Sequence, residues 1–473
     1  MRSAIRWLVV LPLATVGASS PASDLGISDS GHYITYRGED LLLVGDSGTQ
    51  CVMQNANIDY RGWIDDCADR GIRAVHLWSF VPPRQKADGS VIEDRYGYVY
   101  PGLTPWARHE GGPPANDGFP QWDLTRFDEG EAPANYWPRL RDLCGYARDR
   151  GIIVGITVFF GWPKWNTPER PDWAYHPLNV INGGHLTDEG DIVTAPQTIH
   201  SPGTEVWRED WSDGWPDAKK TQWVWERLSE KLIRETEPFG NVFFCFMDEH
   251  SYPEGNCGDH FMEFYRSRGA VWVDWEDRRA GVDWVCSPTL PGEDENSAAV
   301  EAFGREPVRP YVLLEGPPYM GDGLRRAMWT FLIGGGHYLF HGDERQETVR
   351  TGIMGYDPEV DGGDKAMDKR DWLGHASRLL NRRLLSVDAM APHNELIGEG
   401  SYCLASPGRE YVIYSLPGAT IDDLRLPPGP HRARFYDPRT GRYGDAFPLQ
   451  GGQPLSIPKP SEADWVLHIR SED

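Results

Sequence analysis

The sequence feature that most constrains the fold is a regular alternation of short apolar runs and helix-like segments between residues 41 and 340. The apolar runs have the length of buried strands, and Gly71 and Gly151 stand where helices before two of these runs would end. Such alternation at short spacing is typical of parallel βα units. The predicted strands cover residues 41–44, 73–80, 152–160, 242–247, 270–275, 283–287, 311–314 and 338–340. Eight such units predict a closed α/β barrel of the (β/α)8 TIM type.

A different pattern begins near residue 389. From there, short alternating apolar runs such as EYVIYSL and DWVLHI are separated by proline and glycine turns. This pattern predicts a small antiparallel β-sandwich. A chain of 473 residues has room for one large barrel and one such domain. We therefore expect a catalytic barrel over residues 24–388 and a C-terminal β-sandwich domain over residues 389–473.

The first 18 residues have the pattern of a secretory signal peptide. Arg2 and Arg6 precede an apolar run over residues 7–16, and small residues then lead to Ala18. This run is too short to span a bilayer, and no other stretch approaches the roughly 18 apolar residues that spanning requires. We therefore expect a secreted or periplasmic protein without membrane insertion.

Net charge excludes some classes of partner. The 47 basic and 71 acidic residues give 47 − 71 = −24, and loss of Arg2 and Arg6 with the signal peptide would give −26. Nucleic acids and anionic membrane surfaces require a basic footprint, so neither is expected as a partner. The seven cysteines show no CxxC metal spacing, and a disulfide between Cys51 and Cys67 stays open. The oligomeric state is not indicated by the sequence.

Two predicted strands each deliver an acidic residue at the carboxyl end. The run NVFFCFM leads into Asp248 and Glu249, and the run YVLL leads into Glu315. Binding sites of TIM barrels are built at this end of the strands. Cleavage of a glycosidic bond requires an acid that protonates the departing oxygen and a second carboxylate, about 5 to 5.5 Å away in retaining enzymes. Glu249 and Glu315 are therefore predicted as the catalytic pair of a retaining glycoside hydrolase.

Three segments carry a resemblance to a known family. LLLVGDSGTQ with GIRAVHLWSF, VLLEGPPYMGDGLRRAMWTFLIGGGHYLFHG, and FYDPRTGRYGDAF with DWVLHI occur in that order. The chain thereby resembles the apiosidase-like barrel glycoside hydrolases of the clan A type, whose C-terminal β domain is called collagen-binding-like. The resemblance implies Glu315 as nucleophile, Glu249 as acid/base and Asp46 in the sugar pocket. The chain departs from the family at Asp248, where Asn is common, at residues 47–49, where Thr-Ala-Trp is common, and at residues 318–320, where Tyr-Glu is common.

Further residues are predicted to bind the sugar. The chain has 20 Trp, 20 Tyr and 16 Phe, a load that suits stacking on sugar rings, although core packing is the alternative for each tryptophan. For His176 and Asn179, in the loop with the sequence HPLN, the alternative to a sugar contact is a hydrogen bond within the loop. His337 is interpreted as a satisfied barrel histidine, and neither a metal nor another cofactor is predicted. The predicted substrate-binding residues are Asp46, Trp78, Trp162, Trp165, His176, Asn179, Asp248, Tyr319 and His341.

Other functions of the same cleft stay open. An inverting hydrolase or a polysaccharide lyase with a Tyr and His pair would use the same barrel face. A non-catalytic carbohydrate-binding barrel would bind sugar at the same face of the barrel without cleaving it. The presence of both Glu249 and Glu315 argues against this alternative. Sugar, linkage and exo or endo action depend on long loops, which a single sequence specifies least.

Overall fold

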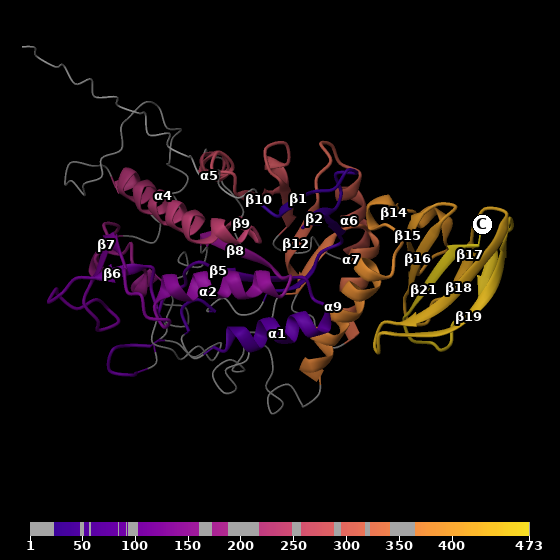
Figure 1. Cartoon of the computed structure of the whole chain (residues 1–473), viewed down its shortest axis with the longest axis horizontal. Helices are drawn as coiled ribbons and strands as arrows, with labels where there is room; N and C mark the ends of the chain where they lie inside the picture. The colour runs from indigo at the N-terminus through magenta and orange to yellow at the C-terminus, as the bar shows by residue number, and fades with distance from the viewer. Residues whose placement is uncertain are drawn as a thin grey trace, which may run out of the picture.

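The barrel and the β domain are both present in the computed structural model of the chain (Figure 1). The structure describes residues 23–47, 52–55, 58–83, 85–90, 92, 103–159, 173–187, 217–247, 257–287, 295–316, 322–340 and 365–472. For residues 217, 218, 247, 257, 315 and 365–368 it describes the backbone alone. No helix in these ranges has the length and apolar character that crossing a membrane requires.

Eight parallel strands close the barrel in the order β10-β11-β12-β13-β4-β5-β8-β9, which confirms the predicted fold. Their bounds are β4 (Val44–Asp46), β5 (Ala74–Trp78), β8 (Ile153–Phe159), β9 (Val242–Met247), β10 (Val271–Trp275), β11 (Trp284–Ser287), β12 (Tyr311–Gly316) and β13 (His337–Phe340). In chain order, β9 is the fourth strand of the barrel and β12 is the seventh.

Helices surround this barrel and separate its strands. Helix α1 begins after Asp59, whose side chain accepts a hydrogen bond from the Gly62 amide, and it ends at Gly71 in the left-handed conformation with φ of 83°. The helices are α1 (Tyr60–Arg70), α2 (Tyr136–Asp149), α4 (Asp217–Thr236), α5 (Cys257–Arg266), α6 (Glu295–Phe303), α7 (Asp322–Ile333) and α9 (Lys365–Arg382). Short 3-10 turns lie at Trp173–Tyr175, Val180–Asn182, Glu237–Phe239, Glu276–Arg278, Val387–Ala389 and Asn394–Leu396.

The first barrel strand lies further along the chain than predicted. Residues 41–44 were expected, whereas β4 spans Val44–Asp46. The backbone of Leu42 is diverted, because its amide and carbonyl both bond to the side chain of Asn381 in α9. Leu41 instead ends β3 (Glu39–Leu41), which forms a small antiparallel sheet with β1 (Leu25–Ile27) and β2 (Ile34–Tyr36).

Two groups of apolar side chains form the barrel core, because strand residues alternate between the interior and the helix layer. The interior group includes Phe243, Trp284 and Leu339, and side chains of β1 and β2 join it at the amino ends of the strands. The larger group packs outward side chains, such as Phe244 and Val285, against the helices. The thiols of Cys67, Cys144 and Cys403 are free and buried, and Cys245 and Cys286 are buried as well. Cys67 therefore does not form the disulfide that the sequence left open.

The segment between β5 and α2 contains an antiparallel pair of strands. Strand β6 (Trp106–Arg108) pairs with β7 (Trp122–Phe127), and both tryptophans are buried. The sequence did not predict this pair of strands from an alternation of apolar and polar residues, because the pair depends on the packing of the Trp106 and Trp122 rings against the barrel.

The C-terminal domain consists of two antiparallel layers, as the alternating sequence predicted. A six-stranded sheet has the order β14-β15-β16-β21-β18-β19, and β17 pairs with β20. The bounds are β14 (Ala391–Pro392), β15 (Ser401–Ser406), β16 (Glu410–Ser415), β17 (Ile421–Leu424), β18 (Gly429–Asp437), β19 (Arg442–Gly451), β20 (Leu455–Ile457) and β21 (Trp465–Ser471). One face of the larger sheet packs on α7, beside α9 (Figure 1).

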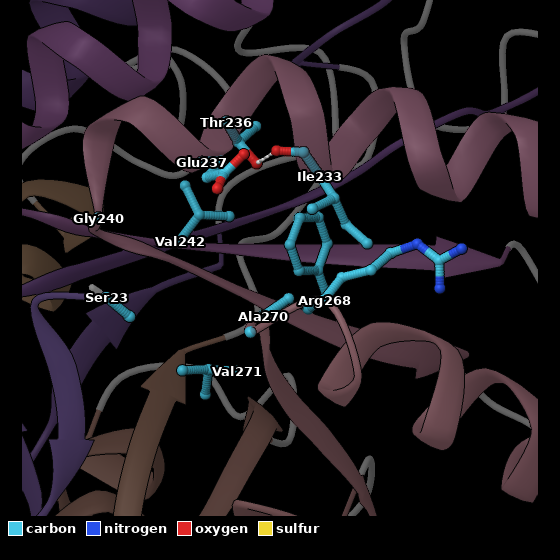
Figure 2. Close-up of a pocket in the computed structure, with 11 residues that line it drawn as sticks. Ser23, Ile233, Thr236, Glu237, Gly240, Val242, Arg268, Ala270 and Val271 are labelled. Carbon is cyan, nitrogen blue, oxygen red and sulfur yellow. Dashed lines mark hydrogen bonds between the residues drawn. The ribbon is translucent and has the colours of Figure 1, made fainter. Parts of the chain in front are cut away.

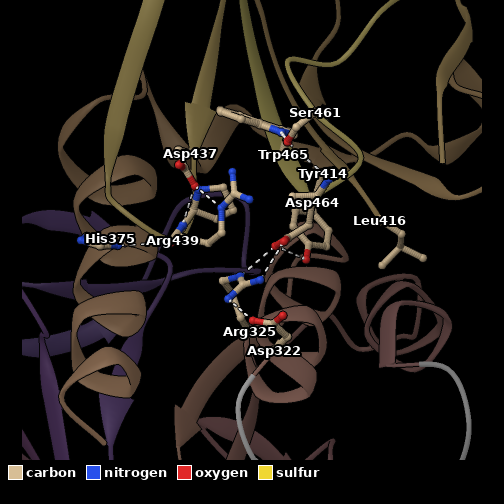
Figure 3. A network of polar contacts seen from close by, with 12 residues as sticks. Asp322, Arg325, His375, Tyr414, Leu416, Asp437, Arg439, Ser461, Asp464 and Trp465 are labelled. Atoms are coloured by element: carbon tan, nitrogen blue, oxygen red, sulfur yellow. Dashed lines mark hydrogen bonds and ion pairs between the residues drawn. The ribbon is translucent and has the colours of Figure 1, made fainter. Parts of the chain in front are cut away.

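A buried polar network joins this domain to the barrel (Figure 3). The guanidinium of Arg325 in α7 donates two hydrogen bonds of 2.8 Å to the carboxylate of Asp464. The hydroxyl of Tyr414 in β16 donates to the same carboxylate at 3.0 Å, and its ring stacks on Trp329. Burial alone would raise the pKa of Asp464, but Arg325 offsets this and holds that pKa below its usual value.

Candidate functional site

A layer of buried polar groups lies at the carboxyl ends of the barrel strands. Ser47 directly follows β4, and its hydroxyl lies 2.8 Å from the carbonyl oxygen of Leu314 in β12. The same hydroxyl lies 2.7 Å from Nδ1 of His76 in β5. The Nε2 atom of His76 lies 2.8 Å from the hydroxyl of Thr157 in β8. Ser47, His76 and Thr157 are all buried, so water does not compete for these bonds.

Proton counting fixes the direction of the hydrogen bonds. Ser47 has one hydroxyl proton, and the Leu314 carbonyl can only accept, so Ser47 donates to Leu314. The Nδ1 atom of His76 must then donate to Ser47. In a neutral imidazole, Nε2 accepts from the Thr157 hydroxyl. The chain of donors thus runs from Thr157 to the carbonyl of Leu314.

The backbone of Glu315 lies next to this layer. The Leu314 carbonyl belongs to the peptide unit that leads into Glu315, at the end of β12. The amide of Ser47 donates to the carbonyl of Phe340 in β13, so Ser47 contacts both strands. Strand β9 ends at Met247 on the same face of the barrel, and the chain there leads into Asp248.

Several predicted site residues fall outside the described part of the chain. The side chain of Glu315 belongs to this group, although its backbone is described. The others are Trp162, Trp165, Asp248, Glu249, Tyr319 and His341. The roles of these residues therefore stay predictions.

Asp46 is held in a buried ion pair. Its Oδ2 atom accepts from Nε1 of Trp63 at 2.9 Å and from Nε of Arg370 at 3.0 Å. Arg370 also donates to Asp66 of α1 at 3.0 Å. Burial opposes the charge of Arg370, yet Asp46 and Asp66 keep the pKa of its guanidinium above the usual value. The Oδ2 atom of Asp46 therefore joins β4 to α1 and α9. A contact between Asp46 and a sugar stays a prediction.

For Trp78, the structure favours the core-packing alternative over a sugar contact. Its side chain is fully buried at the end of β5 and packs against His76, with 4.7 Å between ring centroids. The ring has no exposed surface in this structure, which suits core packing, and a sugar contact of Trp78 stays a prediction.

The HPLN loop likewise shows internal contacts. His176 is 2% exposed and stacks on Trp173, and burial lowers its pKa to about 3. Its Nδ1 atom accepts from the Leu178 amide at 3.1 Å. The side chain of Asn179 accepts from the Ile181 amide at 3.0 Å and donates to the Trp173 carbonyl. Because these bonds shape the loop itself, the internal-hydrogen-bond alternative is favoured for both residues.

His337 is a satisfied barrel histidine, as interpreted from the sequence. Its Nδ1 atom accepts from the Leu43 amide at 2.8 Å, so Nε2 carries the proton and donates to the His32 carbonyl at 3.1 Å. Burial lowers its pKa to about 4. Within the described ranges, no group of three or more His, Cys, Asp or Glu side chains could hold a metal ion.

Sequence reasoning missed the roles of Ser47, His76 and Thr157. The sequence feature that could have indicated these roles is a polar residue at an inward position of an otherwise apolar strand. His76 is such a residue in AVHLW, and Thr157 is such a residue in IVGITVF. The partners lie 29 and 81 residues from His76, so only the closed barrel brings them together.

Two cavities of the described chain lie away from these strand ends. A cavity of about 190 Å³ is lined by Gly240, Val242 and Val271 among others (Figure 2). Val242 and Val271 are the first residues of β9 and β10, so this cavity lies at the amino ends of the strands. A second cavity, of about 670 Å³, lies in the C-terminal domain and is lined by residues of β18 to β21.

Comparison with known proteins finds similarity in structure alone. No protein-family model matches the chain, and no curated protein matches it in sequence. A solved glycoside hydrolase is similar with a TM-score of 0.60 over 95% of this chain and 97% of its own, at 11% identity. A family 5 glycoside hydrolase from Bacteroides vulgatus is similar with a TM-score of 0.61 over 95% of this chain and 93% of its own, at 15% identity. At such identities the likeness shows the fold alone, which is a TIM barrel followed by a β domain.

Proposed function

We propose that the chain is a secreted, retaining glycoside hydrolase that acts on a plant, algal or microbial polysaccharide or oligosaccharide. The observation that carries the proposal is that β9 and β12, two strands whose sequences lead into or end on acidic residues, end at one face of the barrel. Glu315 lies at the end of β12, the seventh strand, and Glu249 follows the fourth strand, β9, by two residues. Solved glycoside hydrolases with the same fold over nearly the whole chain add support. A retaining mechanism needs two carboxylates that face one cleft.

In the proposed reaction, the Glu315 carboxylate attacks the anomeric carbon while Glu249 donates a proton to the departing glycosidic oxygen. Glu249 then accepts a proton from water, whose oxygen displaces Glu315 from the sugar. Negative charge on Glu315 favours the protonated form of Glu249 before the first step. Asp248 either binds a sugar hydroxyl or assists the proton transfer.

The test is a screen for sugar release from a panel of plant and algal polysaccharides, with Glu249→Ala and Glu315→Ala as matched variants. We expect hydrolysis by the native chain and loss of at least about 10³-fold in kcat for each variant, because each removes a group that acts in the transition state. Circular dichroism would establish that the variants fold. Full activity in either folded variant contradicts the proposed pair.

The products distinguish the alternatives within the same cleft. A retaining enzyme releases the sugar first in the configuration of the substrate, and proton NMR follows the anomeric signal during early turnover. Initial release of the opposite anomer would identify an inverting hydrolase. An unsaturated product that absorbs ultraviolet light would identify a lyase, and binding without turnover of any polymer would favour a carbohydrate-binding barrel.

Export is the second part of the proposal. We expect the mature protein to begin near residue 19, after cleavage at Ala18. Intact mass of the protein recovered from the periplasm or medium measures this. Recovery of the uncleaved chain in the cytoplasm alone contradicts it.

A further inference from the structure

We propose that Ser47, His76 and Thr157 are positioning residues that set the backbone path of β12 directly before Glu315. This inference rests on the proposed function, because it assigns a purpose to the placement of Glu315. The three side chains do not contact the reacting atoms in this scheme. They act through the carbonyl of Leu314, to which the chain of hydrogen bonds leads.

The ladder between β12 and β13 is interrupted where Glu315 stands. Leu313 pairs with Tyr338, whereas the next pair joins Gly316 to Phe340. Strand β12 therefore advances by three residues while β13 advances by two. An extra residue of this kind is a β-bulge, which leaves part of the backbone without regular ladder bonds and redirects side chains. The peptide before Glu315 thus requires an anchor other than β13.

Ser47 supplies this anchor from the end of β4, a strand that is not a neighbour of β12. The strand order is β12-β13-β4, so no ladder bond joins β4 to β12. The amide of Ser47 bonds to Phe340 of β13, and its hydroxyl reaches past that strand to Leu314 at 2.8 Å. One residue therefore fixes the ends of three strands relative to one another.

Buried polar side chains in a barrel interior have an energetic cost. Burial of a hydroxyl or an imidazole is unfavourable unless its polar atoms are bonded, and an apolar side chain would fill the same space without that requirement. The barrel interior nevertheless holds three such groups in sequence, and each bond polarises the next. A fully connected polar network in a core is less stabilising than apolar packing, but it fixes the positions of the groups that it bonds. In this network, the group whose position is fixed is the Leu314 carbonyl.

Gly316 shows that space is also limited around β12 directly after Glu315. A Cβ atom at this position would lie 2.3 Å from the hydroxyl oxygen of Tyr338, which is fully buried. Glycine therefore allows close approach of β12 to β13 immediately after Glu315. The backbone of β12 is thus limited directly before Glu315 by the Ser47 hydroxyl, at Leu314, and directly after it by the Tyr338 side chain, at Gly316.

The test compares Ser47→Ala with Ser47→Thr in the full chain. Alanine removes the donor to Leu314, whereas threonine retains a hydroxyl. We expect Ser47→Ala to lower kcat by on the order of 10- to 100-fold, since displacement of a reacting group by about 1 Å has effects of this size. We expect KM to stay within about twofold, and Ser47→Thr to recover most of kcat. Activity is measured on the best substrate of the panel and divided by the folded fraction.

Two further variants keep the test decisive. Thr157→Val is nearly isosteric and removes only the first donor, so it should fold and lower kcat less than Ser47→Ala does. Ser401→Ala removes a buried hydroxyl that bonds to the Thr420 carbonyl in the C-terminal domain, and it should leave kcat unchanged.

The outcomes separate this inference from the proposed function. Full activity of Glu315→Ala would overturn the proposed function, and with it the inference. Loss of activity in Glu315→Ala together with full kcat in folded Ser47→Ala and Thr157→Val would overturn the inference alone. A loss in Ser47→Ala that disappears once activity is divided by the folded fraction would also overturn it, since the role would then be merely structural.

Discussion

Asp46 stands where barrel enzymes build their sites, yet part of its carboxylate is used by the fold. Its Oδ2 atom bonds to Trp63 and to Arg370, and both charged side chains of the pair are nearly inaccessible to water. Removal of one partner from a buried ion pair leaves an uncompensated charge. The contribution of Asp46 should therefore appear first in stability.

Asp46→Asn is expected to lower the free energy of unfolding by about 3 kcal/mol, because Arg370 loses a buried charge partner. Urea unfolding followed by circular dichroism measures this. Asp24→Asn is the matched control, since Asp24 pairs with Arg37 on the surface and should change stability by less than about 1 kcal/mol. Unchanged stability of Asp46→Asn with a large loss of kcat/KM would instead establish Asp46 as a sugar contact.

Asp274 in β10 gives a prediction on pH. Its side chain is fully buried, and burial raises its pKa to about 7, although Arg278 opposes the shift. The unfolded chain releases this proton near pH 4, so the native state binds more protons between about pH 4 and 7. The stability that this group contributes is present below pH 4 and is lost as the pH rises through 7.

Asp274→Asn removes the titration and retains an oxygen that can accept from the Trp275 amide. The free energy of unfolding of the variant minus that of the native chain should rise by up to about 1.4 kcal/mol per pH unit from pH 4 to 7. Urea unfolding at several pH values measures the difference. A difference that is constant over this range would contradict the assignment.

At the scale of elements, α7 and α9 join the barrel to the β domain. Helix α9 bonds to β4 through Arg370 and to the β domain through His375, whose carbonyl accepts from the Tyr436 hydroxyl. Helix α7 contributes Arg325, which is paired with Asp464 in a buried position (Figure 3). Removal of either partner of this pair would leave the other charge buried between the two domains without compensation.

Asp464→Asn should therefore loosen the contact between the two domains. We expect a loss of about 3 kcal/mol in the free energy of unfolding, and faster release of the C-terminal domain under limited proteolysis. Asp423→Asn is the matched control, because its pair with Arg425 is exposed in the same domain and should have little effect. Identical proteolysis of the two variants would contradict a role of Asp464 in holding the domains together.

Elements with long apolar runs were predicted correctly from the sequence, and elements defined by distant contacts were not. Strands β8 and β9 are apolar on both faces, as parallel strands covered by helices must be. The first strand was misplaced because Asn381, far along the chain, takes the backbone bonds of Leu42. The pair β6–β7 was missed because its local sequence lacks a clear alternation.

The same limit applies to the candidate site. The local run YVLL predicts Glu315 at the end of the seventh strand, and the backbone of β12 confirms this position. The network of Ser47, His76 and Thr157 could not be predicted, because its members come from three strands that only barrel closure brings together. Local sequence determines which residues end a strand, whereas the hydrogen-bond partners of those residues depend on the complete barrel.

The proposed activity of the whole molecule depends on Glu315 as the nucleophile of a retaining glycoside hydrolase. The most direct measurement is azide rescue of Glu315→Ala on the best substrate of the panel. Azide can enter the space left by the carboxylate and attack the anomeric carbon from the same side. If Glu315 is the nucleophile, activity returns with azide and the product is a glycosyl azide of inverted configuration. Full activity of Glu315→Ala without azide would contradict this role of Glu315.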